Sequence, residues 1–210
     1  QLRMGQTGSV PFIGTFSPSG GNLKEPVTEN TKKVARCFYA LEQERADRKR
    51  YPAINPIDSY SKYLEYPEFA DYVAERVGAG WIDQVSELKQ WLIRGKEISE
   101  QINILGDDGV PLDYHLTFWK SELIDFIICQ QDAFDSIDCN CSLERQEFMV
   151  RRVMQVCHTE FSFEGFVEVG DFFKELINAF RQMNYAEFDS DEFRKQQAKA
   201  DELVSQRAKN

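Results

Sequence analysis

Apolar residues in the second half of the chain recur every three or four positions, which is the spacing of amphipathic helices. The first such run predicts a helix over 83–105, and its apolar positions are Val85, Leu88, Leu92, Gly95, Ile98, Ile102 and Leu105. Similar runs predict three more helices, over 113–131, 143–161 and 166–183. Gly-Asp-Asp-Gly-Val-Pro at 106–111 separates the first two helices, because glycine and proline interrupt helical patterns.

The first part of the chain follows another pattern, in which short apolar stretches alternate with turn residues. Residues 10–16 predict a strand, since they contain β-forming side chains. Thr28 predicts the N-cap of a helix that continues to Pro52, because the residue before a proline is displaced from helical geometry. Residues 51–56 predict an extended segment. The order indicates a βαβ piece, which needs neighbouring strands to form a stable sheet.

The change of pattern near residue 66 predicts a domain boundary. We expect a mixed α/β unit over 1–66, a helical bundle over 67–193 and a polar terminal helix or tail over 194–210. The predicted fold class is therefore mainly α, with a helical bundle preceded by an α/β segment.

Charge and composition exclude several classes of partner. The chain has 210 residues with 25 basic and 35 acidic side chains, giving a net charge of −10. Nucleic-acid backbones and anionic lipid surfaces both attract basic proteins, so neither is an expected partner. Residues 31–50 carry seven bases and three acids, which predicts a solvated helix face or, alternatively, a binding patch. No apolar run approaches the roughly 20 residues of a membrane-spanning helix.

Metal and disulfide chemistry have few candidate residues. The five cysteines include no Cys-x-x-Cys pair, and the chain has only two histidines. Reduced thiols and no metal site are therefore expected.

Several short motifs occur in a fixed order along the chain. They are Pro-Ser-Gly-Gly at 18–21, Glu-Pro-Val-Thr at 25–28, Tyr-Pro-Ala-Ile-Asn at 51–55, Ile-Leu-Gly-Asp-Asp at 104–108 and Gln-Gln-Asp-Ala-Phe-Asp at 130–135. Together they resemble the catalytic A (alpha) subunit of V-type and archaeal-type rotary ATPases. The resemblance covers most of residues 5–160 and fades afterwards. The sequence Asn-Pro-Ile-Asp at 55–58 resembles that of bacterial members and not that of eukaryotic ones.

The resemblance implies that residues 1–66 are the last part of a RecA-like nucleotide-binding domain and that the helical bundle follows it. No Gly-x-x-x-x-Gly-Lys-Ser/Thr phosphate-binding loop occurs in the chain. With the missing start Met, this predicts a C-terminal fragment that is inactive alone. The family implies ATP or ADP with Mg in the intact subunit, and none bound to the fragment. It also implies the B subunit and central-stalk subunits as partners, a cytoplasmic, membrane-peripheral complex, and coupling of ATP hydrolysis or synthesis to ion transport.

By motif, the resemblance places Tyr51 and Phe134 against the adenine ring, with Gln131 as a weaker candidate for the same pocket. A flat heterocycle stacks well on an aromatic face. The alternative is that both rings are ordinary aromatics in a chain with 16 phenylalanines and 8 tyrosines.

The resemblance also implies that the turn between the first two bundle helices contacts the rotor shaft. Its residues are Gly106, Asp107, Asp108 and Gly109. A solvated, helix-capping turn is the plainer interpretation and is compatible with that role. Two rival identities stay open: a stand-alone helical interaction module with no nucleotide role, and the related F-type β subunit, which the Pro-x-Gly-Gly motif disfavours.

Overall fold

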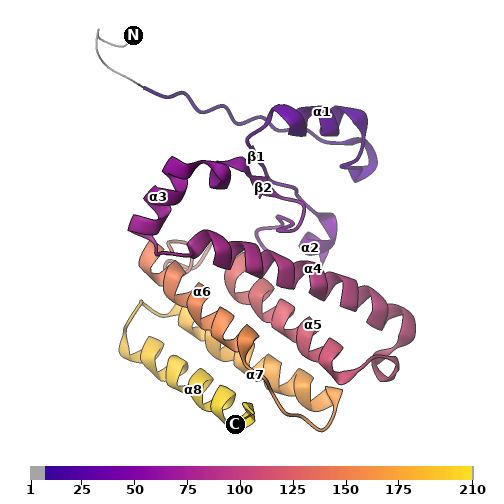
Figure 1. Cartoon of the computed structure of the whole chain (residues 1–210), viewed down its shortest axis with the longest axis vertical. Coiled ribbons are helices and arrows are strands. Elements are labelled where there is room, and N and C mark those ends of the chain that lie inside the picture. Colours follow the sequence, from indigo (N-terminus) through magenta and orange to yellow (C-terminus); the bar gives the residue numbers. More distant parts are fainter. Residues whose placement is uncertain (1–7, 210) are drawn as a thin grey trace.

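A computed structural model describes residues 8–209 of the chain, and these residues are mainly helical, as the sequence predicts (Figure 1). The α-helices are α1 (Pro26–Val34), α2 (Gln43–Asp47), α3 (Pro67–Arg76), α4 (Trp81–Leu105), α5 (Leu112–Ile124), α6 (Leu143–His158), α7 (Phe166–Tyr185) and α8 (Asp191–Arg207). Two strands, β1 (Cys37–Phe38) and β2 (Tyr60–Ser61), pair antiparallel. Short 3-10 turns occupy Ser19–Gly21, Lys62–Glu65 and Asp107–Gly109, and a π-helical turn, Asp125–Cys129, continues α5.

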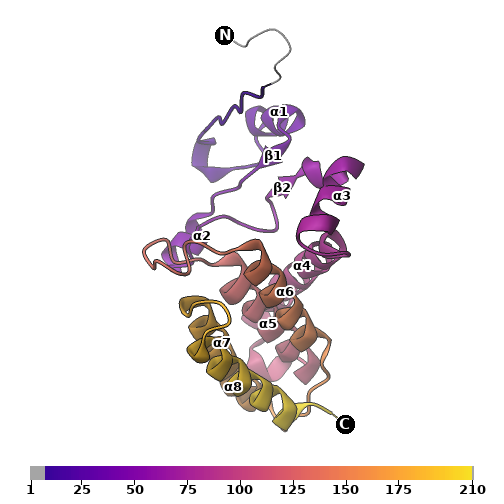
Figure 2. The same ribbon diagram turned by 90° about the vertical axis from the view of Figure 1, so that its left-hand side faces the viewer.

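Helices α4 to α8 pack as a bundle whose core lies along α7 (Figures 1 and 2). Phe173, Leu176 and Phe180 of α7 are almost completely buried. All four helices predicted from periodicity are present, and the limits of three agree with the prediction to within three residues. The helix predicted over 113–131 ends as an α-helix at Ile124 and continues as the π-helical turn to Cys129. Asp113 lies in the first turn of α5 and not at its N-cap, which is Pro111.

Helices α4 and α5 cross at very short range. Gly95 of α4 faces Ser121 of α5, and a Cβ atom at position 95 would overlap the Ser121 side chain. The apolar stripe of α4 continues on either side of this point through Leu88, Leu92 and Ile98. The glycine therefore allows the two helices to pack as a tight hairpin.

Two buried cations bind the C-terminal ends of bundle helices. Lys120 Nζ donates to the carbonyls of Cys157 and Thr159, both at 2.8 Å, at the end of α6. Arg145 donates to the carbonyls of Met183 and Asn184 at the end of α7. Carbonyls in a last helical turn have no intrahelical donor and carry partial negative charge, so both side chains stabilise the bundle. Burial lowers the pKa of Lys120.

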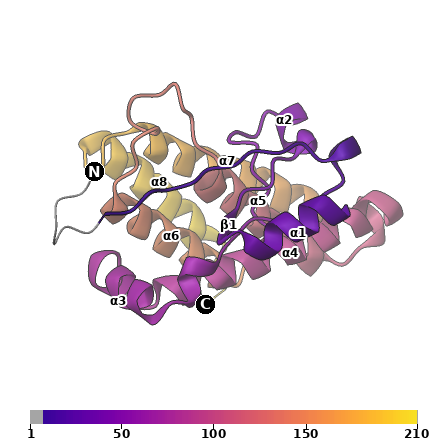
Figure 3. The same cartoon turned by 90° about the horizontal axis from the view of Figure 1, so that it is seen from above.

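The N-terminal part departs from several local predictions. Helix α1 begins at Pro26 with Glu25 as its N-cap, so Thr28 lies inside the helix, and β1 and β2 pair antiparallel, so no βαβ unit forms within the described residues. Residues 10–16 form no strand: they are extended, and the side chains of Val10, Phe12 and Ile13 are almost fully exposed (Figures 1 and 3). A strand requires a hydrogen-bonded neighbour, and none of the described residues pairs with this segment. The helix predicted up to Pro52 ends instead at Val34, after which the backbone turns extended at Ala35 and enters β1.

The last helix packs on the bundle through one apolar side. Phe193 and Ala200 of α8 are buried, whereas most of its other side chains are exposed. Ser190 caps the helix by accepting a hydrogen bond from the Phe193 amide. The division of the chain at residues 66 and 193 stays a prediction, although α3 to α8 all follow residue 66.

Candidate functional site

Tyr51, Gln131 and Phe134 line one cavity of about 530 Å³, which we call the aromatic pocket. Tyr51 follows α2, and the other two residues belong to the loop after the π-helical turn. Phe126 and Arg181 also lie in the wall of the aromatic pocket. A cavity of this size is in the range of small-molecule sites. The structure thus brings together the three residues that the resemblance assigns to adenine.

The two sides of the aromatic pocket are joined through the main chain. The Gln131 amide donates to the Tyr51 carbonyl over 2.9 Å, although the residues are 80 positions apart. Tyr51 is 55% exposed and Phe134 is fully exposed, so both residues are accessible from solvent. The Gln131 side chain donates to the Asp138 carbonyl over 2.7 Å. Gln131 therefore holds the loop in place, and Tyr51 and Phe134 are the accessible aromatic residues of the pocket.

Aspartates hold the loop that carries Phe134. Asp135 Oδ1 accepts hydrogen bonds from the Ile137 and Asp138 amides, and these bonds lower the pKa of Asp135. Asp138 Oδ2 accepts from the Asp132 amide over 2.6 Å. Burial raises the pKa of Asp138 and outweighs that bond. This loop has no helix or strand of its own, so these side-chain bonds fix its shape.

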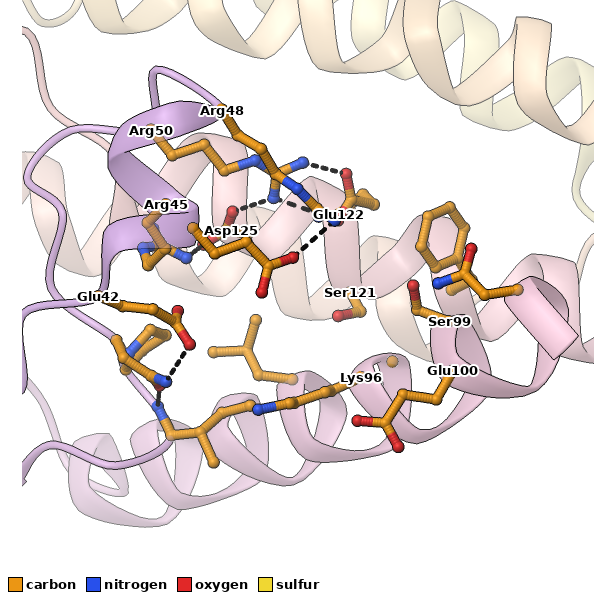
Figure 4. A pocket seen from close by; sticks show the side chains of 18 residues that line it. Glu42, Arg45, Arg48, Arg50, Lys96, Ser99, Glu100, Ser121, Glu122 and Asp125 are labelled. Atoms are coloured by element: carbon orange, nitrogen blue, oxygen red, sulfur yellow. Dashed lines mark hydrogen bonds and ion pairs between the residues drawn. The ribbon is translucent and has the colours of Figure 1, made fainter. Parts of the chain in front are cut away.

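Beside the aromatic pocket, four charged side chains form what we call the arginine–carboxylate cluster (Figure 4). They are Arg45, Arg50, Glu122 and Asp125. Asp125 is buried and accepts from Arg45 Nη1 over 2.7 Å on one oxygen and from Arg50 on the other. Arg50 also binds Glu122 in a bidentate manner, at 2.6 and 3.2 Å. The cluster joins the segment around α2 to the end of α5.

Electrostatics and stacking both hold Arg50 in this position. Burial alone would lower its pKa, but hydrogen bonds and charge from Glu122 and Asp125 outweigh that effect, and the pKa of Arg50 is raised. Its guanidinium group also lies over the Phe126 ring, 4.6 Å from the centroid. Phe126 is part of the aromatic pocket, so the cluster and the pocket share a wall.

A second cavity, of about 210 Å³, lies between the segment around α2 and helices α4 and α5 (Figure 4). Arg45 lines it, and within the described residues the Nε and Nη2 atoms of Arg45 have no hydrogen-bond partner. Both acidic and basic side chains line the cavity, among them Glu100 and Lys96. Its lining therefore favours no single sign of ligand charge.

The arginine–carboxylate cluster was not identified from the sequence. One signal was visible: Asp125 is the only charged residue in the apolar run 123–129. A carboxylate in such a run needs a buried cation, because an unpaired buried charge is costly. The basic segment 31–50 supplies Arg45 and Arg50, which the sequence predicted to lie on a solvated face or in a binding patch.

The predicted rotor-contact turn, residues 106–109, lies at the exposed end of the α4–α5 hairpin. Gly106 has φ of 80°, a left-handed conformation that favours glycine. Ile104 and Leu105, just before the turn, expose their apolar side chains. Buried His115 of α5 lies with Nε2 2.9 Å from the Asp107 carbonyl, and its ring stacks on Phe166. The turn is thus anchored to α5 and presents apolar and acidic groups outward.

No group of three or more His, Cys, Asp or Glu side chains within residues 8–209 is arranged to hold a metal ion. Over the same residues, no helix combines the length and apolar character needed to cross a membrane.

Comparison with known proteins finds relatives that align with nearly the whole chain. The chain is 36% identical over 208 residues to the V-type ATP synthase alpha chain of Protochlamydia amoebophila, an alignment that covers 99% of this chain and 35% of that protein. The chain is a homologue of V-type ATP synthase alpha chains. Its identity to the alpha chain of Borrelia duttonii is also 36%, over 92% of this chain and 31% of the relative. The chain therefore spans about a third of the length of the curated relatives it matches.

The family profile and the fold agree with this relationship. The nucleotide-binding domain of the ATP synthase alpha/beta family matches residues 1–61. Among solved structures, the ATP synthase subunit NeqB from Nanoarcheaum equitans superposes with a TM-score of 0.50 at 17% identity, covering 67% of this chain and 33% of that one. At such identity the likeness concerns the fold alone. The helical bundle of this chain thus follows a segment related to the nucleotide-binding domain.

Proposed function

We propose that this chain is the C-terminal part of the catalytic subunit of a V-type ATP synthase or ATPase. The observation that carries the proposal is the aromatic pocket, where Tyr51 and Phe134 lie together although they are 83 positions apart. In the intact subunit, both rings hold the adenine of ATP or ADP by stacking. The match of residues 1–61 to a nucleotide-binding domain supports this role.

Substitution of Tyr51 by alanine in the intact subunit tests the adenine site. Stacking of a base on an aromatic ring contributes about 1–3 kcal/mol, so Y51A weakens ADP binding about 5- to 150-fold. Tyr72→Ala is the matched control, because Tyr72 is equally exposed but lies on α3, outside the aromatic pocket. An affinity that is the same in Y51A, Y72A and the unchanged subunit contradicts the assignment.

The chain supplies the adenine side of the site and not the phosphate side. No phosphate-binding loop occurs in its sequence, so Mg and the phosphates of the nucleotide are held elsewhere in the intact subunit. The B subunit lends an arginine that stabilises the transition state. We therefore expect no ATP hydrolysis by the 210-residue chain alone, and steady turnover by the pure chain would contradict the proposal.

The α4–α5 hairpin carries the mechanical role. Its exposed end, residues 106–109, contacts the central stalk, and the ATP-driven tilt of the bundle is converted there into rotation and ion transport. The complex is peripheral to the membrane on the cytoplasmic side. A photo-crosslinking amino acid at position 108 should capture a stalk subunit, whereas the same group at the exposed Asp189, in the turn before α8, should not. Equal capture from both positions, or none from 108, contradicts the contact.

A further inference from the structure

Asp125 is a buried carboxylate that two arginines from a distant part of the chain approach at once. Its side chain is only 5% exposed, and its two oxygens bind Arg45 and Arg50 separately. The pairs are 80 and 75 residues apart in sequence. Asp125 is therefore the point at which the segment around α2 is fixed to the end of α5 (Figure 4).

The residues next to this point form the aromatic pocket. Tyr51 directly follows Arg50, and Phe126 directly follows Asp125 and packs under the Arg50 guanidinium. Further along the same segment, Gln131 binds the Tyr51 carbonyl. The arginine–carboxylate cluster thus fixes the backbone on both sides of the pocket. Because Tyr51 is the next residue after Arg50, holding Arg50 in place also restricts the position of Tyr51.

Stability alone does not account for such a cluster. Taking two arginines and two carboxylates out of water costs about as much free energy as their attraction returns, so buried ion pairs contribute little net stability. They do restrict the geometry strongly, because bidentate arginine–carboxylate pairs have one favourable arrangement. A ligand that stacks on Tyr51 requires that restriction, because stacking depends on the position of the ring.

We propose that Asp125 and Arg50 are positioning residues for the nucleoside base, which they place by fixing Tyr51 against the loop that carries Phe134. This inference rests on the proposed function of the aromatic pocket. It assigns the cluster to base recognition and not to the phosphate side of the nucleotide. Loss of the cluster therefore weakens binding of a nucleotide but leaves binding of a polyphosphate without a base unchanged.

The experiment measures dissociation constants for ADP and for inorganic tripolyphosphate on the intact subunit in its complex. We expect Asp125→Asn to weaken ADP binding about tenfold, which is within the range of one lost stacking contact, with unchanged binding of tripolyphosphate. Glu122→Gln is the second variant, because it removes one half of the bidentate pair and leaves Asp125 in place. It is expected to shift ADP binding in the same direction by a smaller factor. Asp189→Asn is the control, since it breaks the exposed pair with Arg194, and neither residue lines the aromatic pocket.

The outcomes separate this inference from the proposed function. If Y51A weakens ADP binding but D125N and E122Q do not, the positioning role is wrong and the adenine site stands. If D125N weakens ADP and tripolyphosphate equally, the cluster has only a structural role, and the inference fails. If Y51A itself leaves ADP binding unchanged, the proposed function fails, and the positioning role fails with it.

Discussion

Replacing Gly95 by alanine is expected to destabilise the bundle, although alanine is the better helix former. A Cβ atom at position 95 of α4 would overlap Oγ and Cβ of Ser121 on α5, and Ser121 is buried between the two helices. The added methyl group therefore has to force α4 and α5 apart or push Ser121 from its place. Such overpacking costs typically 1–3 kcal/mol, and the loss is at the upper end here because the obstruction lies next to the backbone.

The magnitude follows from two opposing contributions. Alanine gains about 1 kcal/mol over glycine in a helix interior, so a clash of about 3 kcal/mol leaves a net loss of about 2 kcal/mol for G95A. The Cα atom of Ser121 would lie 3.7 Å from the new Cβ, which is an ordinary contact. Ser121→Gly therefore removes the obstruction completely. In that background the same G95A substitution is expected to stabilise the chain by about 1 kcal/mol.

A double-mutant cycle tests the packing. The free energy of unfolding of the four proteins is measured by urea denaturation followed by circular dichroism. We expect a coupling of about 3 kcal/mol between positions 95 and 121. Ser121→Ala is the control that keeps the obstructing Cβ, so it should not rescue G95A. If G95A has the same effect whether position 121 carries serine or glycine, the close approach of the two helices is refuted.

Three further predictions concern buried groups. Lys120→Met is expected to lower the free energy of unfolding by about 2 kcal/mol, because two carbonyls at the end of α6 lose their donor. Lys174→Met, at an exposed site, should change it by less than about 0.5 kcal/mol, and urea denaturation of both variants measures the difference. In native protein at pH 8, iodoacetamide is expected to modify the exposed Cys139 but not the buried Cys157, and peptide mass spectrometry that finds Cys157 alkylated without denaturant contradicts the packing of α6. Burial raises the pKa of Cys157 from 9.0 to about 12. The folded state keeps this proton while the unfolded state releases it, so the contribution of Cys157 to stability is fully present below pH 9 and falls by about 1.4 kcal/mol per pH unit from pH 9 to 12. Cys157→Ala should make the measured slope shallower by that amount in urea titrations at each pH, and Cys129, whose pKa burial also raises to about 12, keeps its own share of the slope.

The helices of the bundle were predictable because each one buries a continuous stripe of its own residues. In α7 the stripe of Val169, Phe172, Phe173, Leu176 and Phe180 appears in the sequence at the same spacing as in the folded core. The strand predicted at 10–16 could not be judged from its own residues in this way, because a strand forms its hydrogen bonds with a neighbouring strand. The same segment carries exposed Phe12 and Ile13, so its β-forming residues are present but none of the described residues pairs with it.

The candidate site was only partly predictable for a related reason. Tyr51, Gln131 and Phe134 have no periodic relation, and only the resemblance to a known family placed them in one pocket. The bond between the Gln131 amide and the Tyr51 carbonyl supports their proximity in a way that no spacing rule predicts. The resemblance did not predict the arginine–carboxylate cluster either. Arg45 and Asp125 are 80 residues apart, so the sequence shows only an acid in an apolar run and, separately, a basic segment.

Helix α5 connects the two candidate sites. Its first residue, Leu112, follows the exposed turn at 106–109, and its last turn passes directly into Asp125 and the aromatic pocket. At 1.5 Å per residue, the thirteen residues of α5 extend about 20 Å. His115 contacts the turn from one end, and Asp125 holds Arg50 at the other. Gly95 lets α4 pack tightly on the last turn of α5, at Ser121, so we expect the hairpin to move as one body and to carry a displacement of the turn to the cluster. A looser α4–α5 contact, as in G95A, should therefore weaken the connection between the two sites before it unfolds either of them.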